Sequence, residues 1–208
     1  VFNGCNQLLL INWNVQAAIT AESFDTPAKM GNLLIFAPEG TGCTYEGNVV
    51  INGMAEKISL THGKGFRSPQ AFKAKDITYK RNFSMKSGNK INAAGWEAIV
   101  LPFDVQSFSN EKQGELAPFN SGKKGAKPFW LAQMTTDGFE HTTAMKANKP
   151  YIISLPNSES YEDEFNISGE VQFHAEDASG VEVKATSYKE LARIEGSNRI
   201  MIPAYETV

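Results

Sequence analysis

Apolar and polar residues alternate along several segments of the chain, which is typical of β-strands with one buried face and one solvated face. The segment 77–83 places Ile, Tyr, Arg and Phe at every second position, and the segment 165–173 has the same period. Residues 177–180, Asp-Ala-Ser-Gly, separate the second segment from another alternating run at 181–185. This order predicts two strands joined by a hairpin turn at 177–180.

Three further apolar runs predict strands of a different kind. The run 96–105 is apolar on both faces, which favours a strand that is covered on both sides. Pro102 interrupts it and cannot donate a ladder hydrogen bond, so we expect a bulge or a sheet edge there. The runs 129–134 and 151–155 are shorter, and prolines flank the latter at both ends. We expect the large apolar side chains of 96–105 to lie in the core.

Helical patterns are short, whereas turn residues are abundant. Ser187–Ile194 has the spacing for two helical turns, and Ala17–Phe24 for one more. The chain contains 17 Gly and 9 Pro, which fits many short strands joined by turns. We therefore predict a mostly β fold, with an antiparallel β-sandwich-like domain over residues 47–208. Helix should stay below roughly a fifth of the chain, against a usual share of about a third.

The first 46 residues follow a different rhythm. Phe2, Cys5, Leu8 and Ile11 recur at every third position, which fits neither a strand nor a helix. A solenoid coil, in which a short strand and a turn feed successive inward positions, has such a pattern. We expect residues 1–46 to form one or two terminal coils of a leucine-rich-repeat-like array, docked on the β domain.

The two cysteines leave two interpretations open. Cys5 and Cys43 can form a disulfide in an oxidising compartment. They can equally be two buried free thiols, because free cysteine packs as a small hydrophobe. The three-residue rhythm points Cys5 inward, so we predict a buried free thiol at that position.

Composition narrows the classes of partner. The net charge of −3 and the lack of a basic face indicate no nucleic-acid partner. No apolar run approaches the roughly 18 residues of a membrane span. A chain of 208 residues can bury a core without a metal or a disulfide, and the sequence indicates no cofactor. The chain starts at Val1 without a signal peptide, so we expect a processed or excised piece.

The segment 1–11, Val-Phe-Asn-Gly-Cys-Asn-Gln-Leu-Leu-Leu-Ile, resembles the repeat of BspA-like leucine-rich repeat proteins. These are cell-surface proteins common in Bacteroidetes, and their repeats carry Phe, Gly-Cys, Leu and Ile at this spacing. The segments 48–60, 72–83, 95–105 and 149–155 look like the β-rich region that follows the repeats in many of these proteins. That region usually runs about a strand further, so we expect the last sheet to be incomplete in this chain.

The resemblance implies a secreted protein at the cell surface, in the outer envelope. It implies adhesion to, or recognition of, a host or bacterial surface macromolecule, which can be a protein or a glycan. The family has no agreed catalytic residues or cofactor that could be transferred to this chain. The role implied is therefore a non-catalytic one.

Two tryptophans are candidates for stacking against a sugar, because an aromatic ring offers an apolar face and a polar edge. Trp96 opens the most apolar strand, which favours a place in the core. Trp130 follows a polar loop at 122–128 that contains three lysines, which favours access to solvent. Trp130 is therefore the one candidate ligand-binding residue, although a core position is also consistent with its apolar neighbours.

No metal site is predicted. The acidic residues Glu159, Glu162, Asp163 and Glu164 offer oxygen ligands for Ca²⁺, but they lack the spacing and the glycine of a calcium loop. A solvated hairpin tip explains them better. The three histidines do not fall at ligand spacing in any pair; they are His62, His141 and His174.

Catalytic motifs are absent from the sequence. It has no Gly-x-Ser-x-Gly elbow, no His-Glu-x-x-His and no phosphate-binding loop. Glu97 and Asp104 could form a glycosidase pair, but they fall on opposite faces of a regular strand. We therefore predict a non-catalytic recognition module, with a carbohydrate-binding module as the alternative and an enzyme third.

Overall fold

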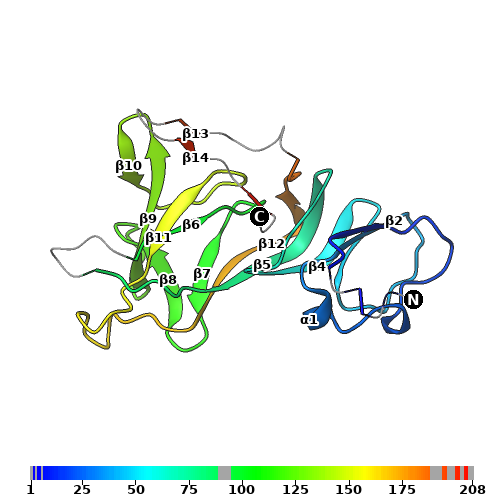
Figure 1. Ribbon diagram of the computed structural model, residues 1–208, viewed down its shortest axis with the longest axis horizontal. Helices are drawn as coiled ribbons and strands as arrows, with labels where there is room; N and C mark the ends of the chain where they lie inside the picture. The colour runs from blue at the N-terminus through cyan, green and yellow to red at the C-terminus, as the bar shows by residue number, and fades with distance from the viewer. Residues whose placement is uncertain are drawn as a thin grey trace.

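The computed structural model is built almost entirely of β-strands (Figure 1). Strand makes up 42% and helix 4% of the described residues, which confirms the mostly β prediction. The described residues are 2, 4–5, 7–88, 95–187, 194–195, 200–201 and 204–205. Most of Ser187–Ile194, for which we expected two helical turns, lies outside them.

Three short parallel strands form the N-terminal end of the molecule, at the right in Figure 1. They are β1 (Leu10–Asn12), β2 (Leu34–Ala37) and β3 (Asn48–Ile51). Between β1 and β2 lie the 3-10 turn η1 (Ala21–Ser23) and the single-turn helix α1 (Pro27–Met30). The expected turn within Ala17–Phe24 is thus present, but it is shorter than expected. A separate hydrophobic cluster fills this unit, and its centre is Phe24 stacked on Tyr45 at 4.8 Å.

Asparagine side chains connect this unit to strand β4 (Met54–Thr61). β3 pairs with β4 at only one position, Ile51 with Met54. Further along β4, the Asn48 amide accepts from the Ser59 N–H and donates to the Ser59 carbonyl, at 2.7 and 3.1 Å. The buried Asn32 does the same at Thr61, at 2.8 and 3.0 Å. The two amides therefore satisfy backbone groups on this edge of β4 as a neighbouring strand would.

The longest strands are β5 (Phe72–Asn82) and β12 (Glu170–Val183), which pair antiparallel along most of their length. The expected hairpin at 177–180 is wrong. Val171–Glu176 and Val181–Val183 both pair with β5, so the chain continues in one direction and bulges. Asp177 accepts from the N–H and the hydroxyl of Ser179, both at 2.7 Å, so the turn chemistry serves a bulge.

The remaining strands complete a mixed sheet in the order β1-β2-β3-β4-β5-β12-β7-β8-β9-β11-β6, with β10 also paired to β9. The pairs β1·β2, β2·β3, β4·β5 and β8·β9 are parallel, so the sheet is not purely antiparallel as expected. A separate two-stranded ribbon consists of β13 (Ile194–Glu195) and β14 (Ile200–Met201). The strands not yet bounded are β6 (Glu97–Ile99), β7 (Ser107–Asn110), β8 (Gly114–Pro118), β9 (Lys127–Thr135), β10 (Gly138–His141) and β11 (Tyr151–Ser154).

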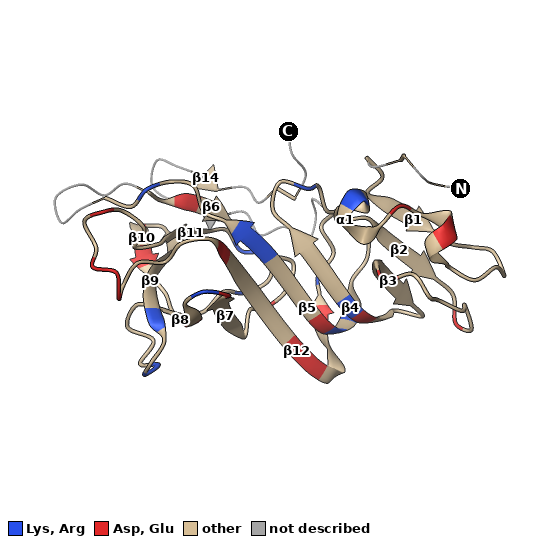
Figure 2. Cartoon of the chain, turned by 90° about the horizontal axis from the view of Figure 1, so that it is seen from below, with Lys and Arg blue, Asp and Glu red and all other residues tan. Residues whose placement is uncertain are grey.

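The strand path from β5 to β6 curves so that its two ends meet. Arg81, near the end of β5, donates to the Ala98 carbonyl of β6 at 2.7 Å and pairs with the Glu97 carboxylate. The blue end of β5 points toward β6 in Figure 2. The larger hydrophobic core draws on the strands of this path and also on β2, β3 and β4. In it Phe173 packs against Phe108 and Tyr79.

The segment 96–105 confirms one expectation and corrects another. Ile99, Leu101 and Phe103 are buried, as the apolar run predicted. The strand ends at Ile99, however, so Pro102 lies in the segment after the strand. β6 is the last strand of the path and therefore forms an edge of the sheet. Ala98 is exposed, so this strand is not covered on both faces.

Charged residues of both signs are interspersed along the chain in Figure 2. Several form exposed ion pairs, such as Lys75 with Glu56 and Lys184 with Glu182. Within the described ranges, no helix has the length and hydropathy needed to cross a membrane.

The prediction of a buried Cys5 is wrong. Cys5 and Cys43 are both free, and both are exposed. Phe2, Leu8 and Ile11 pack against the N-terminal cluster as the three-residue rhythm predicted. Gly4 interrupts the rhythm, since its φ of 82° turns the backbone just before Cys5.

Leu101 tests the core packing of the segment after β6. Its side chain is 2% exposed, so Leu101→Ala should lower the free energy of unfolding by about 2–5 kcal/mol. Val15→Ala, at a position that is 53% exposed, is the control and should stay within about 0.5 kcal/mol of the wild type. Urea denaturation measures both values, and equal midpoints for the two variants would place Leu101 outside the core.

The exposure of the two thiols has a direct chemical test. Ellman's reagent should modify both Cys5 and Cys43 in native buffer, because both residues are exposed and neither is in a disulfide. The measurement is the number of thiols released before and after addition of denaturant, and the two counts should agree. A native count near zero would indicate a disulfide or two buried thiols.

Candidate functional site

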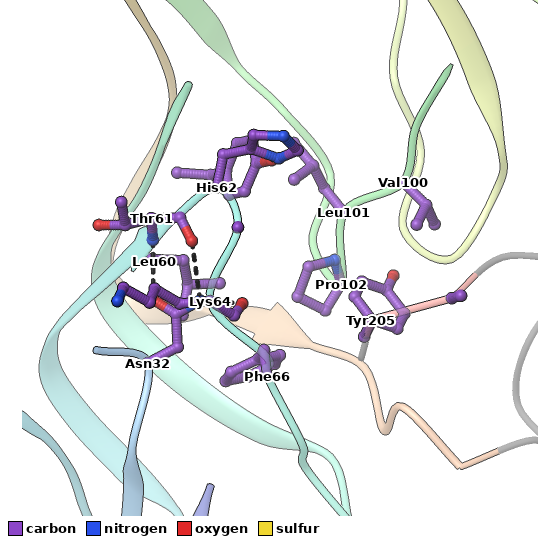
Figure 3. Close-up of a pocket in the computed structure, with 13 residues that line it drawn as sticks. Asn32, Leu60, Thr61, His62, Lys64, Phe66, Val100, Leu101, Pro102 and Tyr205 are labelled. Carbon is purple, nitrogen blue, oxygen red and sulfur yellow. Dashed lines mark hydrogen bonds between the residues drawn. The ribbon is translucent and has the colours of Figure 1, made fainter. Parts of the chain in front are cut away.

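A groove lies between the end of β4 and the segment that follows β6 (Figure 3). Leu60, Thr61 and His62 form one wall, and Val100, Leu101, Pro102 and Tyr205 form the other. The cavity measures about 200 Å³. A second hollow of about 260 Å³ adjoins it, and both are lined by His62, Tyr79 and Val100. The groove is thus one hollowed region with a largely apolar interior.

The side chain of the buried Asn32 holds the first wall of the groove through hydrogen bonds to backbone groups. Its amide nitrogen donates to the carbonyls of Thr61 and Lys64, at 3.0 and 2.8 Å. The dashed lines in Figure 3 mark the hydrogen bonds between Asn32 and the Thr61 backbone. Gly63 permits the turn between them with a φ of 76°. Since Asn32 belongs to the N-terminal unit, the groove depends on both parts of the chain.

Tyr205 holds the second wall in place. Its hydroxyl donates to the Asn148 side-chain oxygen at 2.7 Å, and its carbonyl accepts from the Phe66 N–H at 3.0 Å. The two rings meet edge to face at 6.5 Å. Burial raises the pKa of the Tyr205 hydroxyl far above its usual value, so the hydroxyl remains a donor at neutral pH.

His62 and Tyr79 form a polar pair at the mouth of the groove. Nδ1 of His62 lies 2.8 Å from the Tyr79 hydroxyl. Burial raises the pKa of Tyr79 to about 12. Burial, followed by the neighbouring Arg81 charge, lowers the pKa of His62 below 6.5. Both groups are therefore neutral at pH 7, and the tautomer of His62 sets which of them donates in this hydrogen bond.

Arg81 and Glu97 lie behind this pair and form a buried ion pair at 2.5 Å. Their side chains are only 7% and 11% exposed. The other Glu97 oxygen accepts from the backbone N–H groups of Ser84 and Met85, at 3.0 and 2.9 Å. With both oxygens engaged, the Glu97 carboxylate serves the fold and is poorly placed to act as a general base.

The two carboxylates considered as a catalytic pair do not share partners. Asp104 is exposed and accepts from Lys146 and from the Ala147 N–H, at 2.7 and 2.8 Å. Partial burial would raise the pKa of Asp104, but these hydrogen bonds outweigh it and hold the pKa below the usual value. Glu97 and Asp104 therefore belong to separate ion pairs, and the lowered pKa of Asp104 does not suit a general acid.

The histidines also occupy separate places. His174 contacts Asp76 at 3.2 Å on the polar face of its strand, and His141 lies beside the Trp96 ring at 6.4 Å. Among the described residues, no three His, Cys, Asp or Glu side chains gather in a group that could hold a metal ion.

Trp130 lies half-buried on β9, and its ring packs against Tyr161 at 5.7 Å. Trp96 is also half-buried. Tyr161 belongs to the loop between β11 and β12, which carries the acidic residues 159–164. A polar hollow of about 700 Å³ lies in this loop. Tyr161 lines this hollow, whereas Trp130 contacts Tyr161 without lining it, and ligand binding by Trp130 stays a prediction.

Sequence reasoning missed the roles of Tyr79, Arg81 and Tyr161. A signal existed for Arg81, because a charged residue stands in the apolar register of the segment 77–83. A charge on the buried face of a strand indicates a buried partner. No local pattern distinguishes Tyr161 from other loop tyrosines.

Comparison with protein-family models, with curated proteins and with solved structures found no match to this chain.

The Arg81–Glu97 pair can be tested by a double-mutant cycle. Arg81→Met leaves Glu97 buried without its partner, so the free energy of unfolding should fall by about 3–5 kcal/mol. Adding Glu97→Leu should recover part of this loss, because the unpaired charge is then removed. Lys75→Met, in the exposed pair with Glu56, is the control and should cost at most about 1 kcal/mol. Equal losses for Arg81→Met and Lys75→Met in urea denaturation would contradict a structural role for the buried pair.

Proposed function

We propose that this chain is a non-catalytic recognition module of a secreted leucine-rich repeat protein at the bacterial cell surface. In this proposal residues 1–46 end a repeat array of the BspA-like type, and residues 47–208 bind a surface macromolecule of host or bacterial origin. The antiparallel β-sandwich-like domain expected over residues 47–208 stays a prediction, because the strands belong to one large mixed sheet whose path curves from β5 to β6. The observation that carries the proposal is the stack of β1, β2 and β3.

This stack has the geometry that a repeat array requires. Leu10, Leu34 and Asn48 are aligned across the three parallel strands. A second parallel bridge joins Ile19 to Cys43, so the intervening segments also stack. Leu34 lies 24 positions after Leu10, and leucine-rich repeats have about 20–29 residues. Asn48 follows only 14 positions later, and terminal repeats are commonly atypical because they cap the array.

The side chains that could have carried catalysis support a binding role. Glu97 is held by Arg81, Asp104 by Lys146, and His62 pairs with Tyr79. A catalytic site needs titratable groups that converge on one pocket and retain a free functional atom. These described groups are engaged in ion pairs or hydrogen bonds within the protein, which suits binding better than turnover.

A carbohydrate-binding module is the second candidate. The observation that favours it is the contact between Trp130 and Tyr161 beside a polar hollow. Aromatic rings next to hydroxyl, amide and carboxylate groups match the alternating apolar and polar faces of a sugar ring.

The surface role is tested on intact cells of the source bacterium and with the purified chain. An antibody against the chain should label intact cells, and brief proteinase K treatment should remove the label. On a biosensor, the chain should bind saturably to at least one of immobilised fibronectin, fibrinogen, collagen, mucin and the neutral glycans of a glycan array.

The same protein preparation should not turn over polysaccharide, peptide or ester substrates. Asp104→Asn is the matched variant, because its side chain is exposed and its loss should leave the fold intact. Hydrolysis by the wild type that disappears in Asp104→Asn would refute the non-catalytic role. A label found only in the cytoplasm of permeabilised cells would refute the surface location.

A further inference from the structure

We propose that the polar hollow beside Tyr161 binds a neutral oligosaccharide, with the Tyr161 ring as the stacking surface. This inference rests on the proposed recognition function, of which it names the ligand class and the site. The hollow lies in the loop between β11 and β12, at the end of the molecule opposite β1, β2 and β3 (Figure 1).

The lining of the hollow is rich in groups that bind sugar hydroxyls. Its volume of about 700 Å³ is within the usual range of small-molecule sites, about 300–1,000 Å³. Amide, hydroxyl, carboxylate and ammonium groups surround one aromatic ring. The residues are Lys86, Asn157, Ser158, Glu159, Ser160, Tyr161, Asp163 and Asn166.

Tyr161 is held in one orientation. Its hydroxyl donates to the Gly88 carbonyl at 2.8 Å, and its backbone N–H donates to the Ser158 carbonyl at 3.2 Å. The Trp130 ring packs against it at 5.7 Å with a tilt of 53°. Tyr161 remains half-exposed. A ring that is fixed before binding loses little conformational entropy when a sugar stacks on it.

Asn157 makes the floor of the hollow equally rigid. It is buried, its side-chain oxygen accepts from the Ser87 N–H at 2.9 Å, and its amide nitrogen donates to the Met85 carbonyl at 3.1 Å. Lys86 donates to the Asn157 carbonyl at 2.9 Å. Hydrogen bonds among Met85, Lys86, Ser87 and Asn157 thus join the segment before Gly88 to the loop after β11. They fix the backbone on which the polar groups of the hollow are placed.

The charge of the loop selects against acidic glycans. Glu159 and Asp163 line the hollow, and Glu162 and Glu164 belong to the same loop. Among the described residues of the lining, Lys86 is the one cation. Sulfated or sialylated sugars would meet this excess of carboxylates and be repelled. Neutral sugar hydroxyls can instead donate to the carboxylates, and such charge-assisted hydrogen bonds are strong.

The test is isothermal titration of the purified chain with cellohexaose, xylohexaose, maltohexaose and chitohexaose, and with a heparin hexasaccharide as the acidic counterpart. At least one neutral hexasaccharide should bind, more tightly than heparin and equally well in EDTA. Tyr161→Ala should weaken this binding about tenfold or more, as the loss of a central aromatic contact does. Tyr161→Phe keeps the ring and should stay within about threefold of the wild type.

Two further variants keep the result interpretable. Asn166→Ala removes a polar group from the rim and should weaken binding several-fold, even if Tyr161→Ala does not fold. Phe139→Ala is the matched control, because Phe139 is an aromatic residue with 45% exposure that does not line the hollow. It should bind like the wild type. Thermal denaturation of each variant verifies that it is folded.

The outcomes separate this inference from the broader one. If no neutral hexasaccharide binds while a protein ligand does on the biosensor, the sugar site is refuted and the recognition role stands. If a sugar binds equally well to the wild type, Tyr161→Ala and Asn166→Ala, the proposed site is refuted. Tighter binding to heparin, or loss of binding in EDTA, would also overturn the proposal.

Discussion

The buried ion pair between Arg81 and Glu97 joins the two ends of the curved strand path. β6 has only three residues and pairs along one edge with β11, so its backbone hydrogen bonds alone fix its position weakly. Arg81 reaches across from β5 to both a carboxylate and a carbonyl of this short strand. A buried charge needs its partner, so this contact strongly favours one position of β6 over others. The groove depends on this position, because its two walls belong to the ends of β4 and β6.

The asparagine contacts with β4 solve a related problem. A strand edge that is paired at only one position leaves its other backbone N–H and C=O groups open to pairing with another chain. Asn32 and Asn48 satisfy the groups of Thr61 and Ser59 with side-chain amides. The N-terminal unit can therefore dock on β4 without adding another long strand. Its own parallel strands need not follow the direction of β4.

The two proposals assign the ends of the molecule to different tasks. The stack of β1, β2 and β3 lies at one end, where a repeat array would join the domain. The loop between β11 and β12 lies at the other end, with Tyr161 and its polar hollow. A module attached at one end presents the opposite end to solvent, which suits a protein that recognises a macromolecule beyond the cell surface.

The amino-acid sequence by itself determined the strand-rich character, the positions of several longer strands and the burial of Ile99, Leu101 and Phe103, because alternation and apolar runs show locally which side chains avoid water. It placed the start of β12 too early, since 165–169 precede the strand. Pairing is decided by residues far apart in the chain. The turn-like residues 177–180 fit a hairpin or a bulge equally well, and only the continued pairing with β5 selects the bulge. Likewise, an arginine at position 81 requires a partner, but the curvature of the sheet identifies it as Glu97. Tyr161 becomes a candidate only through the ring of Trp130, since contacts between loops leave no periodic trace in the sequence.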